Sequence, residues 1–522
     1  MLHLGETTDA VSVYKKMISK IQNPFEQLKT DNQCMNYFEE HKTYLPPIQI
    51  KVGEKKFFKI INGEKVPTTK DVTAQIILLR DALKKFFELP DIFDETMSYI
   101  QYLESQKILK TNVIQGLFWQ KKKLEFGTKV VLPLFFYQDD FETNNALGSH
   151  RGLGKMGTVY INIPCLPPRI QSKIDNIFLL SLYKADDLKH VTLNAMLSSA
   201  VSELTFLEST GINISTPRGP QQIYFAFAGV IGDNLAVHSI LGFTGSFNSK
   251  HPCRFCSIDR NDINSMFHES DCLIRTNESY DKDLKINNVN VTGVCGPSIL
   301  HDIKSAQTIE LLTVDVMHDI LEEAKLFTLD TLNDRIMSLF YGADEIRNKP
   351  GKIKNTQISN KYVKMSAGCL KPKHHFLTHY SRIMRMKGPA WHMNIMRNES
   401  MNRNIEMTAV ASLTRKNISK TLAIKHQLHL NYRFLLNNSP NKSLYDVGPS
   451  HKQKISSIPQ VYLFLQFLSD DIKDEVLIHE HIKFKGEVIQ KGVILMIPSE
   501  MNPEFYITRT SGVALVTITR SF

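Results

Sequence analysis

One short run of apolar residues most constrains how this chain can fold. The segment KVVLPLFFYQ, residues 129–138, is followed at once by Asp139 and Asp140. A run of this length, rich in β-forming residues and closed by two acids, is typical of a buried strand. The run therefore predicts a strand that stops at the acidic pair.

Three further segments of the sequence also predict strands. Residues 157–163 and 177–183 predict two more strands, and residues 223–231 predict a fourth, which ends at Gly232-Asp233-Asn234. Between the third and fourth strands, residues 188–207 carry apolar side chains at helical spacing. A hairpin sheet joined by a crossover to a further strand predicts an α/β fold in which helices cover a mixed sheet.

Changes in the sequence pattern along the chain suggest five regions. We expect a mainly helical N-terminal region (1–125), a first part of the α/β core (126–243), an irregular insertion (244–386), the last helices of the core (387–440) and a small C-terminal β-rich module (441–522). The first region includes a helix-like piece at 72–87, and the last core helices begin near Glu399 and Thr421.

Composition narrows the class of protein. The net charge is +10, and the segment 346–425 contains 17 Lys and Arg against only Glu399 and Glu406. Such a density of positive charge favours a nucleic-acid partner over a merely solvated surface. The longest apolar stretch, 130–137, is too short to span a membrane, and seven cysteines argue against a disulfide framework. We therefore expect an intracellular protein with no membrane partner.

Three acids lie at positions where predicted elements end or begin. Asp139 and Asp233 follow apolar strands, and Glu399 opens a helix in the most basic segment. Three converging carboxylates are what two-metal phosphoryl chemistry requires, because Mg²⁺ prefers hard oxygen ligands. Each acid taken alone is better explained as a turn residue or a helix-start residue. The joint pattern is what favours a catalytic site.

A second group of residues has the spacing of a metal site. Cys253 and Cys256 form a Cys-x2-Cys pair, and the later segment offers His379 with either His374 or His375. Two thiolates and two imidazoles would complete a tetrahedral structural zinc site. Surface histidines and reduced cysteines explain the same residues equally well.

Other polar residues suggest no chemistry of their own. His318 and Asp319 fit a helix start with Asp at the cap, so we assign them no catalytic role. The sequence contains no nucleophile elbow, Walker loop or dinucleotide-binding glycine motif.

Several segments, taken in order over roughly residues 20–500, resemble one family. These are YQDDFETNNALGSHRGLGKMGTVYINIPCLPP, AFAGVIGDNLAVHSILGF, HPCRFC, DVMHDILE and LKPKHHFLTHY followed by MRNES. They resemble the CACTA (En/Spm-type) transposases and their Mirage and Chapaev relatives. The resemblance implies a DDE transposase with an RNase H-like fold, distantly related to the catalytic subunit of the V(D)J recombinase.

The resemblance also implies roles for individual residues. Asp139, with Asp140 as the fallback, matches the first catalytic aspartate, Asp233 the second, and Glu399 the glutamate, and together they would bind Mg²⁺ or Mn²⁺. Cys253 lies 20 residues after Asp233, and His379 lies 20 before Glu399. This spacing resembles that of the related recombinase and implies a Zn²⁺ site made of Cys253, Cys256, His374 and His379, with His374 favoured over His375.

By the same resemblance, the partners would be transposon-end and target DNA, the location the nucleus, and the active form a homo-oligomer. Two departures from the family argue against autonomous transposition more than against the fold: a helical block is missing between the DVMHDILE and KPKHHF motifs, and the N-terminal segment is short. The alternatives are a domesticated, non-catalytic DNA-binding or chromatin protein on the same fold, and a zinc-organised protein-interaction scaffold.

Overall fold

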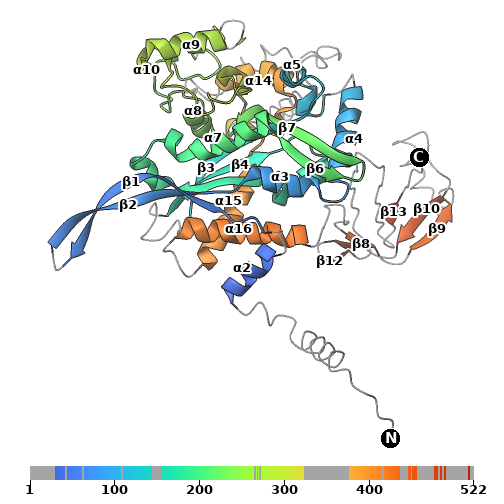
Figure 1. Ribbon diagram of the computed structural model, residues 1–522. Coiled ribbons are helices and arrows are strands. Elements are labelled where there is room, and N and C mark those ends of the chain that lie inside the picture. Colours follow the sequence, from blue (N-terminus) through green and yellow to red (C-terminus); the bar gives the residue numbers. More distant parts are fainter. Residues whose placement is uncertain are drawn as a thin grey trace.

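The computed structural model describes residues 30–40, 44–61, 64–106, 110–143, 154–263, 266, 268–269, 272–321, 375–412 and 417–435, and the backbone of six short strands beyond residue 444. Statements about the structure below concern these residues, and the elements carry the labels of Figure 1. None of the helices in these ranges is long and apolar enough to cross a membrane.

A curled mixed sheet of seven strands forms the centre of the fold (Figure 1). The strands lie in the order β1-β2-β5-β4-β3-β7-β6, and all neighbours are antiparallel except β3 and β7, which are parallel. Their bounds are β1 Ile48–Ile61, β2 Glu64–Ile76, β3 Val130–Glu142, β4 Lys155–Asn162, β5 Phe178–Lys184, β6 Ile212–Thr216 and β7 Gly219–Ile231. The expected mixed α/β architecture is therefore confirmed.

Helices cover both faces of this sheet (Figure 1). On one face lie α3 (Leu79–Phe87) and α7 (Leu193–Ser209), and on the other lie α15 (Met396–Ala411) and α16 (Ile418–Leu435). Strand β3 is buried from Val131 to Gln138 because it has a strand on each side and helices above and below. This explains why its sequence is an unbroken apolar run rather than an alternating one.

Strand β3 is longer than the sequence predicted. We expected it to end before Asp139, but it continues through Asp139 and Asp140 to Glu142. The antiparallel pairing of β3 with β4 continues to Glu142 and places Asp139 opposite Thr158. The parallel pairing of β3 with β7, in contrast, stops at Tyr137. Beyond Tyr137, therefore, one edge of β3 has no strand beside it, and Asp139 lies on this open edge.

The described part of the region 1–125 contains four helices, α2 to α5, and also two long strands that we did not expect. It contributes β1 and β2 to the main sheet, and residues 72–76, which we expected in a helix, end β2. Only Ala74–Ile76 of β2 pair with β5, so the rest of the hairpin projects from the sheet as a two-stranded arm (Figure 1). Long-range pairing with β5 is what decides the strand conformation here, and local periodicity does not reveal it.

The remaining elements surround this core. The other described helices are α2 Asp31–Glu40, α4 Ile92–Ser105, α5 Leu117–Glu125, α6 Pro168–Gln171, α8 Asn234–Ile240, α9 Asn277–Ile286, α10 Val289–Thr292 and α14 Tyr380–Lys387. The C-terminal strands are β8 Tyr445–Val447, β9 Ser450–Lys454, β10 Glu475–His479, β11 Ile482–Phe484, β12 Glu487–Ile489 and β13 Leu515–Thr517, in two three-stranded sheets. The β-rich character that we expected after residue 440 is present in these strands.

The central strand makes a direct stability prediction. Leu132 on β3 has no exposed surface, so Leu132→Ala removes buried methyl groups and leaves a cavity. We expect the free energy of unfolding to fall by about 2–5 kcal/mol in urea titrations. The control Leu124→Ala alters a side chain that is 80% exposed and should change stability by less than about 0.5 kcal/mol. Equal effects of the two substitutions would contradict this placement of β3.

Candidate functional site

Asp139 and Asp233 come from neighbouring parallel strands at the same level of the sheet. The register pairs Tyr137 of β3 with Ile231 of β7, and each aspartate follows two residues further along its own chain. Parallel neighbours lie about 4.8 Å apart, so both carboxylates emerge at one edge. The negative charge of Asp233 accordingly contributes to raising the pKa of Asp139.

The Asp139 carboxylate is held by three donors. The Tyr137 hydroxyl and the Asn402 side-chain amide donate to Oδ2 at 2.9 and 3.0 Å, and the backbone N–H of Asp140 donates to Oδ1 at 2.7 Å. Burial raises the pKa of Asp139, while the bonds from Tyr137 and Asp140 act in the opposite sense, and the net direction is upward. A cation beside this carboxylate would offset the charge that burial disfavours.

The alternation of side chains along β3 separates Asp139 from Asp140. Asp139 lies on the face that carries α15, since it contacts Asn402 of that helix. Asp140 lies on the opposite face, where it accepts a long bond from the Gln138 amide, and Gln138 also reaches the Tyr183 hydroxyl. Of the two adjacent acids, Asp139 is therefore the one on the same side as Glu399.

Glu399 lies in the first turn of α15, and two asparagines of this helix set its position. Asn398 exchanges hydrogen bonds with Asn162 of β4 at 3.0 and 3.2 Å. One turn later, Asn402 accepts a bond from Thr158 at 3.0 Å and donates to Asp139. These amide contacts register α15 over β3 and β4, so that the Glu399 charge acts on the pKa of Tyr137 beside Asp139.

Asp233 also caps a helix. Its Oδ1 accepts a hydrogen bond of 2.5 Å from the backbone N–H of Ala236, which is the usual contact of an N-cap aspartate at the start of α8. Asp233 is therefore a helix-start residue, which is one of the two explanations that the sequence offered for it. This capping contact does not compete with a role at the sheet edge, because a carboxylate has a second oxygen.

His318 belongs to the same site, although we assigned it no role from the sequence. It lies in the π-helical turn Met317–Leu321, and Asp315 caps the start of this turn, as the sequence predicted, because its Oδ1 accepts a bond of 3.3 Å from the backbone N–H of His318. Its Nδ1 donates to the buried Asp315 carboxylate at 2.5 Å, and its Nε2 lies 3.7 Å from Oε1 of Glu399. π-helical turns often occur at functional positions. The irregular turn has no sequence signature that we could have used.

The three acids do not form a compact ligand cage. Of the described residues, only the group Cys253, Cys256, His375 and His379 brings three or more potential ligand atoms within 4.8 Å of one another. The carboxylates of Asp139, Asp233 and Glu399 are therefore spaced more widely than the ligands of a single bare ion. Wider spacing is compatible with Mg²⁺, which keeps several water ligands and uses one or two carboxylates.

Cys253, Cys256, His375 and His379 form a buried cluster that can bind a metal ion such as zinc. The Sγ of Cys253 lies 3.6 Å from Nε2 of His379, and the Sγ of Cys256 lies 3.2 Å from Nε2 of His375. The two Nε2 atoms are 3.2 Å apart. Ligands of a tetrahedral zinc ion at ordinary bond lengths are separated by about 3.3–3.6 Å, so the donor set and spacing both fit.

The structure brings together three of the four metal ligands that the sequence predicted. Cys253, Cys256 and His379 come together, and the remaining position of the cluster is occupied by His375, whereas the sequence analysis favoured His374. His374 lies outside the described residues. The helical turn that begins at His375 brings His375 and His379 to one side, as expected for residues four apart. The half-buried Cys272, which the sequence analysis left unassigned, adjoins Cys256.

A further carboxylate orients one ligand of this cluster. Oε1 of Glu269 lies 2.7 Å from Nδ1 of His379 and accepts a bond of 2.7 Å from Nε of Arg382. A carboxylate on the far nitrogen of a metal-binding histidine fixes the tautomer that presents Nε2 to the metal. Arg382 in turn holds Glu269, so this basic residue is already engaged within the protein.

Arg254 connects the Cys/His cluster to the carboxylates. It lies between the two cysteines, is fully buried, and donates from Nη1 to Asn234 Oδ1 at 2.6 Å and from Nη2 to the Thr313 carbonyl at 3.0 Å. Asn234 donates at 2.7 Å to Asp319, which also accepts a bond of 3.0 Å from the Tyr380 hydroxyl. Asn234 directly follows Asp233, so this network constrains the start of α8.

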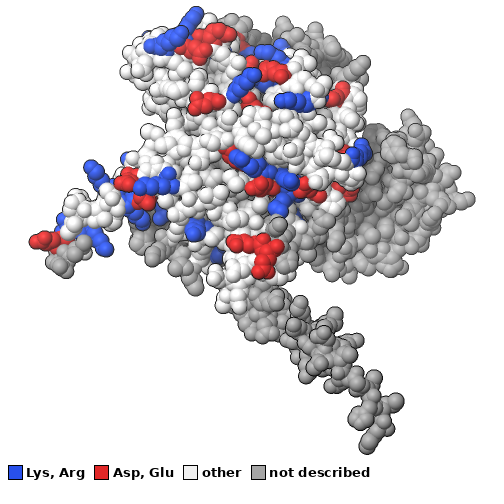
Figure 2. Space-filling view, in the orientation of Figure 1, with Lys and Arg blue, Asp and Glu red and all other residues white. Residues whose placement is uncertain are grey.

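The basic segment 346–425 is only partly described, and its described residues do not all face solvent. Lys387 is buried and donates to the carbonyls of Ala228 and Glu310, so it supports the fold and cannot contact phosphates. On the face shown in Figure 2, Lys and Arg are interspersed with Asp and Glu over the described part. The part of the predicted nucleic-acid surface that comprises residues 346–374 and 413–416 lies outside the described residues.

Comparison with known proteins identifies no relative: no family model matches the chain, and no curated protein matches it. The resemblance to the CACTA transposases therefore stays a prediction based on the motifs.

The Cys/His cluster makes a prediction that separates two adjacent residues. His375→Ala removes a ligand and should reduce the bound zinc from about one equivalent to a small fraction after dialysis. His374→Ala is the matched control and should retain the metal. Metal content measured by mass spectrometry decides between them. Loss of zinc from the His374 variant alone would contradict the observed cluster.

The buried arginine makes a second prediction. Arg254→Met leaves the Asp319 carboxylate buried without its cationic neighbour, and we expect stability to fall by about 3–5 kcal/mol in chemical unfolding. The control Arg260→Met changes an exposed arginine in the same loop and should lower stability by less than about 1 kcal/mol. A mild effect of Arg254→Met would mean that the network does not hold the two sites together.

Proposed function

We propose that this chain is a DDE-type DNA transposase, or a derivative of one, that cleaves and transfers DNA strands with Mg²⁺ or Mn²⁺ in the nucleus. One observation carries the proposal: Asp139 on β3 and Asp233, two residues beyond the end of the neighbouring strand β7, lie at one sheet edge, and the helix that carries Glu399 contacts Asp139 through Asn402. The motifs that resemble the CACTA transposases supply the same three residues independently.

The strand order supports an RNase H-like core. Strands β3, β4 and β5 form consecutive antiparallel pairs, and the chain then crosses over through α7 to β7, which lies parallel to β3 on its other side. This is the hairpin sheet with a crossover strand that we expected for such a core. The β1–β2 arm and β6 extend the sheet at its two edges.

The residues of the site have distinct tasks in the proposed reaction. Asp139, Asp233 and Glu399 would hold divalent cations, which, when bound, polarise the scissile phosphate and lower the pKa of the attacking water. Tyr137 and Asn402 hold the Asp139 carboxylate in place by hydrogen bonds. The fixed carboxylate can then bind a cation without a large rearrangement of the site.

His318 lies close to Glu399. Its contact with the buried Asp315 fixes the ring, and its Nε2 faces Glu399.

In the proposed reaction, water first cleaves one phosphodiester bond and leaves a 3′-hydroxyl. This hydroxyl then attacks a phosphodiester of a target strand and displaces its 3′-oxygen by the same in-line chemistry. The described site is thus proposed to perform two successive displacements with one set of side chains.

A second candidate is a DNA-binding or chromatin protein that has kept the fold without catalysis. The observation that favours it is the wide spacing of the carboxylates, which do not gather as closely as the Cys/His ligands do. The two candidates share a DNA partner and differ in whether a bound strand is cut.

The test is a cleavage assay with Asp233→Asn. Asparagine caps a helix as well as aspartate does, so the substitution keeps the α8 cap while it removes the charge. We expect Mg²⁺-dependent cleavage to fall by about 100-fold or more. The matched control Asp259→Asn changes an N-cap aspartate in the insertion and should leave cleavage unchanged.

Three outcomes are informative. Cleavage by the wild-type chain that is lost in Asp233→Asn supports the enzyme. DNA binding that weakens steeply with salt, without any cleavage, supports the non-catalytic candidate. Absence of salt-dependent DNA binding overturns both and leaves a metal-organised interaction scaffold.

A further inference from the structure

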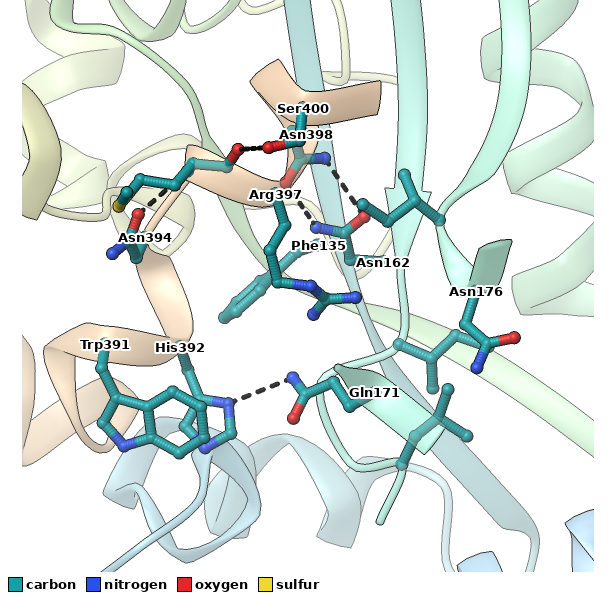
Figure 3. A pocket seen from close by; sticks show the side chains of 14 residues that line it. Phe135, Asn162, Gln171, Asn176, Trp391, His392, Asn394, Arg397, Asn398 and Ser400 are labelled. Carbon is teal, nitrogen blue, oxygen red and sulfur yellow. Dashed lines mark hydrogen bonds between the residues drawn. The ribbon is translucent and has the colours of Figure 1, made fainter. Parts of the chain in front are cut away.

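A cavity of about 410 Å³ opens beside the start of α15 (Figure 3). Its walls come from β3 and β4, from the turns that follow β4, and from the segment that leads into α15. The cavity has the size of small-ligand sites in proteins, which are typically about 300–1,000 Å³. No residue of the proposed catalytic group lines it.

The cavity combines an aromatic platform with amide groups. Trp391 is 44% exposed, and its ring stacks on His392 with centroids 3.8 Å apart (Figure 3). His392 is fixed because its Nε2 donates to the Thr111 carbonyl at 2.9 Å and its Nδ1 lies 3.3 Å from the Gln171 amide. One face of a rigid stacked pair therefore borders the opening, with amide donors and acceptors nearby.

Arg397 projects into the middle of this cavity (Figure 3). One terminal nitrogen donates to the Lys173 carbonyl at 3.0 Å, which anchors the guanidinium. Its Nε is buried and has no hydrogen-bond partner within the described residues. Partial burial lowers the pKa of Arg397, so the cation is held where solvent does not fully stabilise it. Such a group favours an anionic or hydrogen-bond-accepting ligand.

The surroundings contain an excess of positive charge. Burial lowers the pKa of Lys173, and the nearby cations Arg433 and Arg169 lower it further. The opposing acids are Asp175, whose pKa is lowered by its hydrogen bond to His429, and Glu95, which forms an ion pair with Arg169. Arg433 donates to Asn176, a residue of the cavity wall, so this cluster of positive charges extends to the cavity itself.

The cavity and the carboxylates lie on the same face of β3. Phe135 lines the cavity, and Asp139 follows it four residues later on that face, which places the two about 13 Å apart along the strand. On the opposite wall, Asn398 and Ser400 line the cavity on either side of Glu399 in the sequence. A DNA strand bound at the carboxylates would therefore pass within reach of the cavity.

We propose that this cavity binds one unpaired nucleotide of a DNA strand. Its base stacks on the indole of Trp391, and its phosphate pairs with the guanidinium of Arg397. An unstacked base can stack on the flat aromatic face and form hydrogen bonds with the amide groups. The local excess of cations attracts the negatively charged phosphate. This proposal rests on the proposed function, since it assumes that DNA is the substrate.

The first test uses deoxyadenosine 5′-monophosphate and the full-length, zinc-loaded protein. The chain has two tryptophans, and Trp119 is buried, so quenching of the fluorescence of exposed tryptophan reports on Trp391. We expect saturable quenching, and Arg397→Gln should weaken binding by about 10-fold. The matched control Arg403→Gln changes an exposed arginine on the same helix and should leave binding unchanged.

The second test places 2-aminopurine at successive positions of a duplex with a single-stranded overhang. A base that leaves the stack and enters the cavity changes its fluorescence at one position only. Trp391→Ala should abolish this position-specific change and weaken DNA binding by about 10-fold, the loss expected for one stacked base. Trp391→Phe should retain part of it. The control Tyr102→Ala removes an aromatic ring of similar exposure on α4 and should have no effect.

The two tests separate this proposal from the proposed function. Saturable nucleotide quenching that Arg397→Gln weakens, with a position-specific change that Trp391→Ala removes, supports the cavity as a nucleotide site. DNA binding and cleavage without either signal overturn the cavity proposal and leave the proposed function intact. A protein that binds no DNA overturns the proposed function, and the absence of nucleotide quenching then overturns the cavity proposal as well.

Discussion

The buried guanidinium of Arg254 is the constraint on which the site depends. A cation that is fully removed from water is stable only when hydrogen bonds and opposite charge surround it. Arg254 meets this requirement through Asn234, the Thr313 carbonyl and the nearby charge of Asp319. These partners come from segments far apart in the sequence. The Cys/His cluster, the start of α8 and the turn that carries His318 are therefore assembled together, and a metal ion bound by the cysteines would also stabilise the carboxylate edge.

A second set of contacts positions the helix that carries Glu399. These contacts are hydrogen bonds of neutral side-chain amides. Asn398 exchanges hydrogen bonds with Asn162, and Asn402 accepts one from Thr158 and donates one to Asp139. Amide pairs of this kind specify one register of α15 over the sheet, because a shift by one residue would leave buried donors and acceptors unpaired. The position of Glu399 relative to Asp139 is thus decided by polar packing between α15 and the sheet. The negative charges of Asp139 and Asp233 repel each other, and bound cations would relieve this repulsion.

The proposed catalytic edge and the proposed nucleotide cavity lie along one face of β3. Phe135 borders the cavity, Tyr137 donates to Asp139, and Asp139 lies at the open edge of the strand. Helix α15 covers this face and contributes residues to both sites. The turn Ala390–Met393 supplies the aromatic ring of Trp391, α15 supplies Arg397 and Glu399, and β3 supplies Asp139.

The sequence by itself determined the elements whose patterns are local. The apolar run of β3, the strand before Asp233 and the helices around residues 193 and 399 follow from periodicity, and the Cys-x2-Cys pair and the histidine spacing indicated a metal cluster. Only the tertiary structure decided the rest. The β1–β2 hairpin forms through pairing with β5, His375 enters the Cys/His cluster, and His318 approaches Glu399 from a π-helical turn. Contacts between distant segments and the direction of individual side chains decide these features, and a pattern read along one chain contains neither.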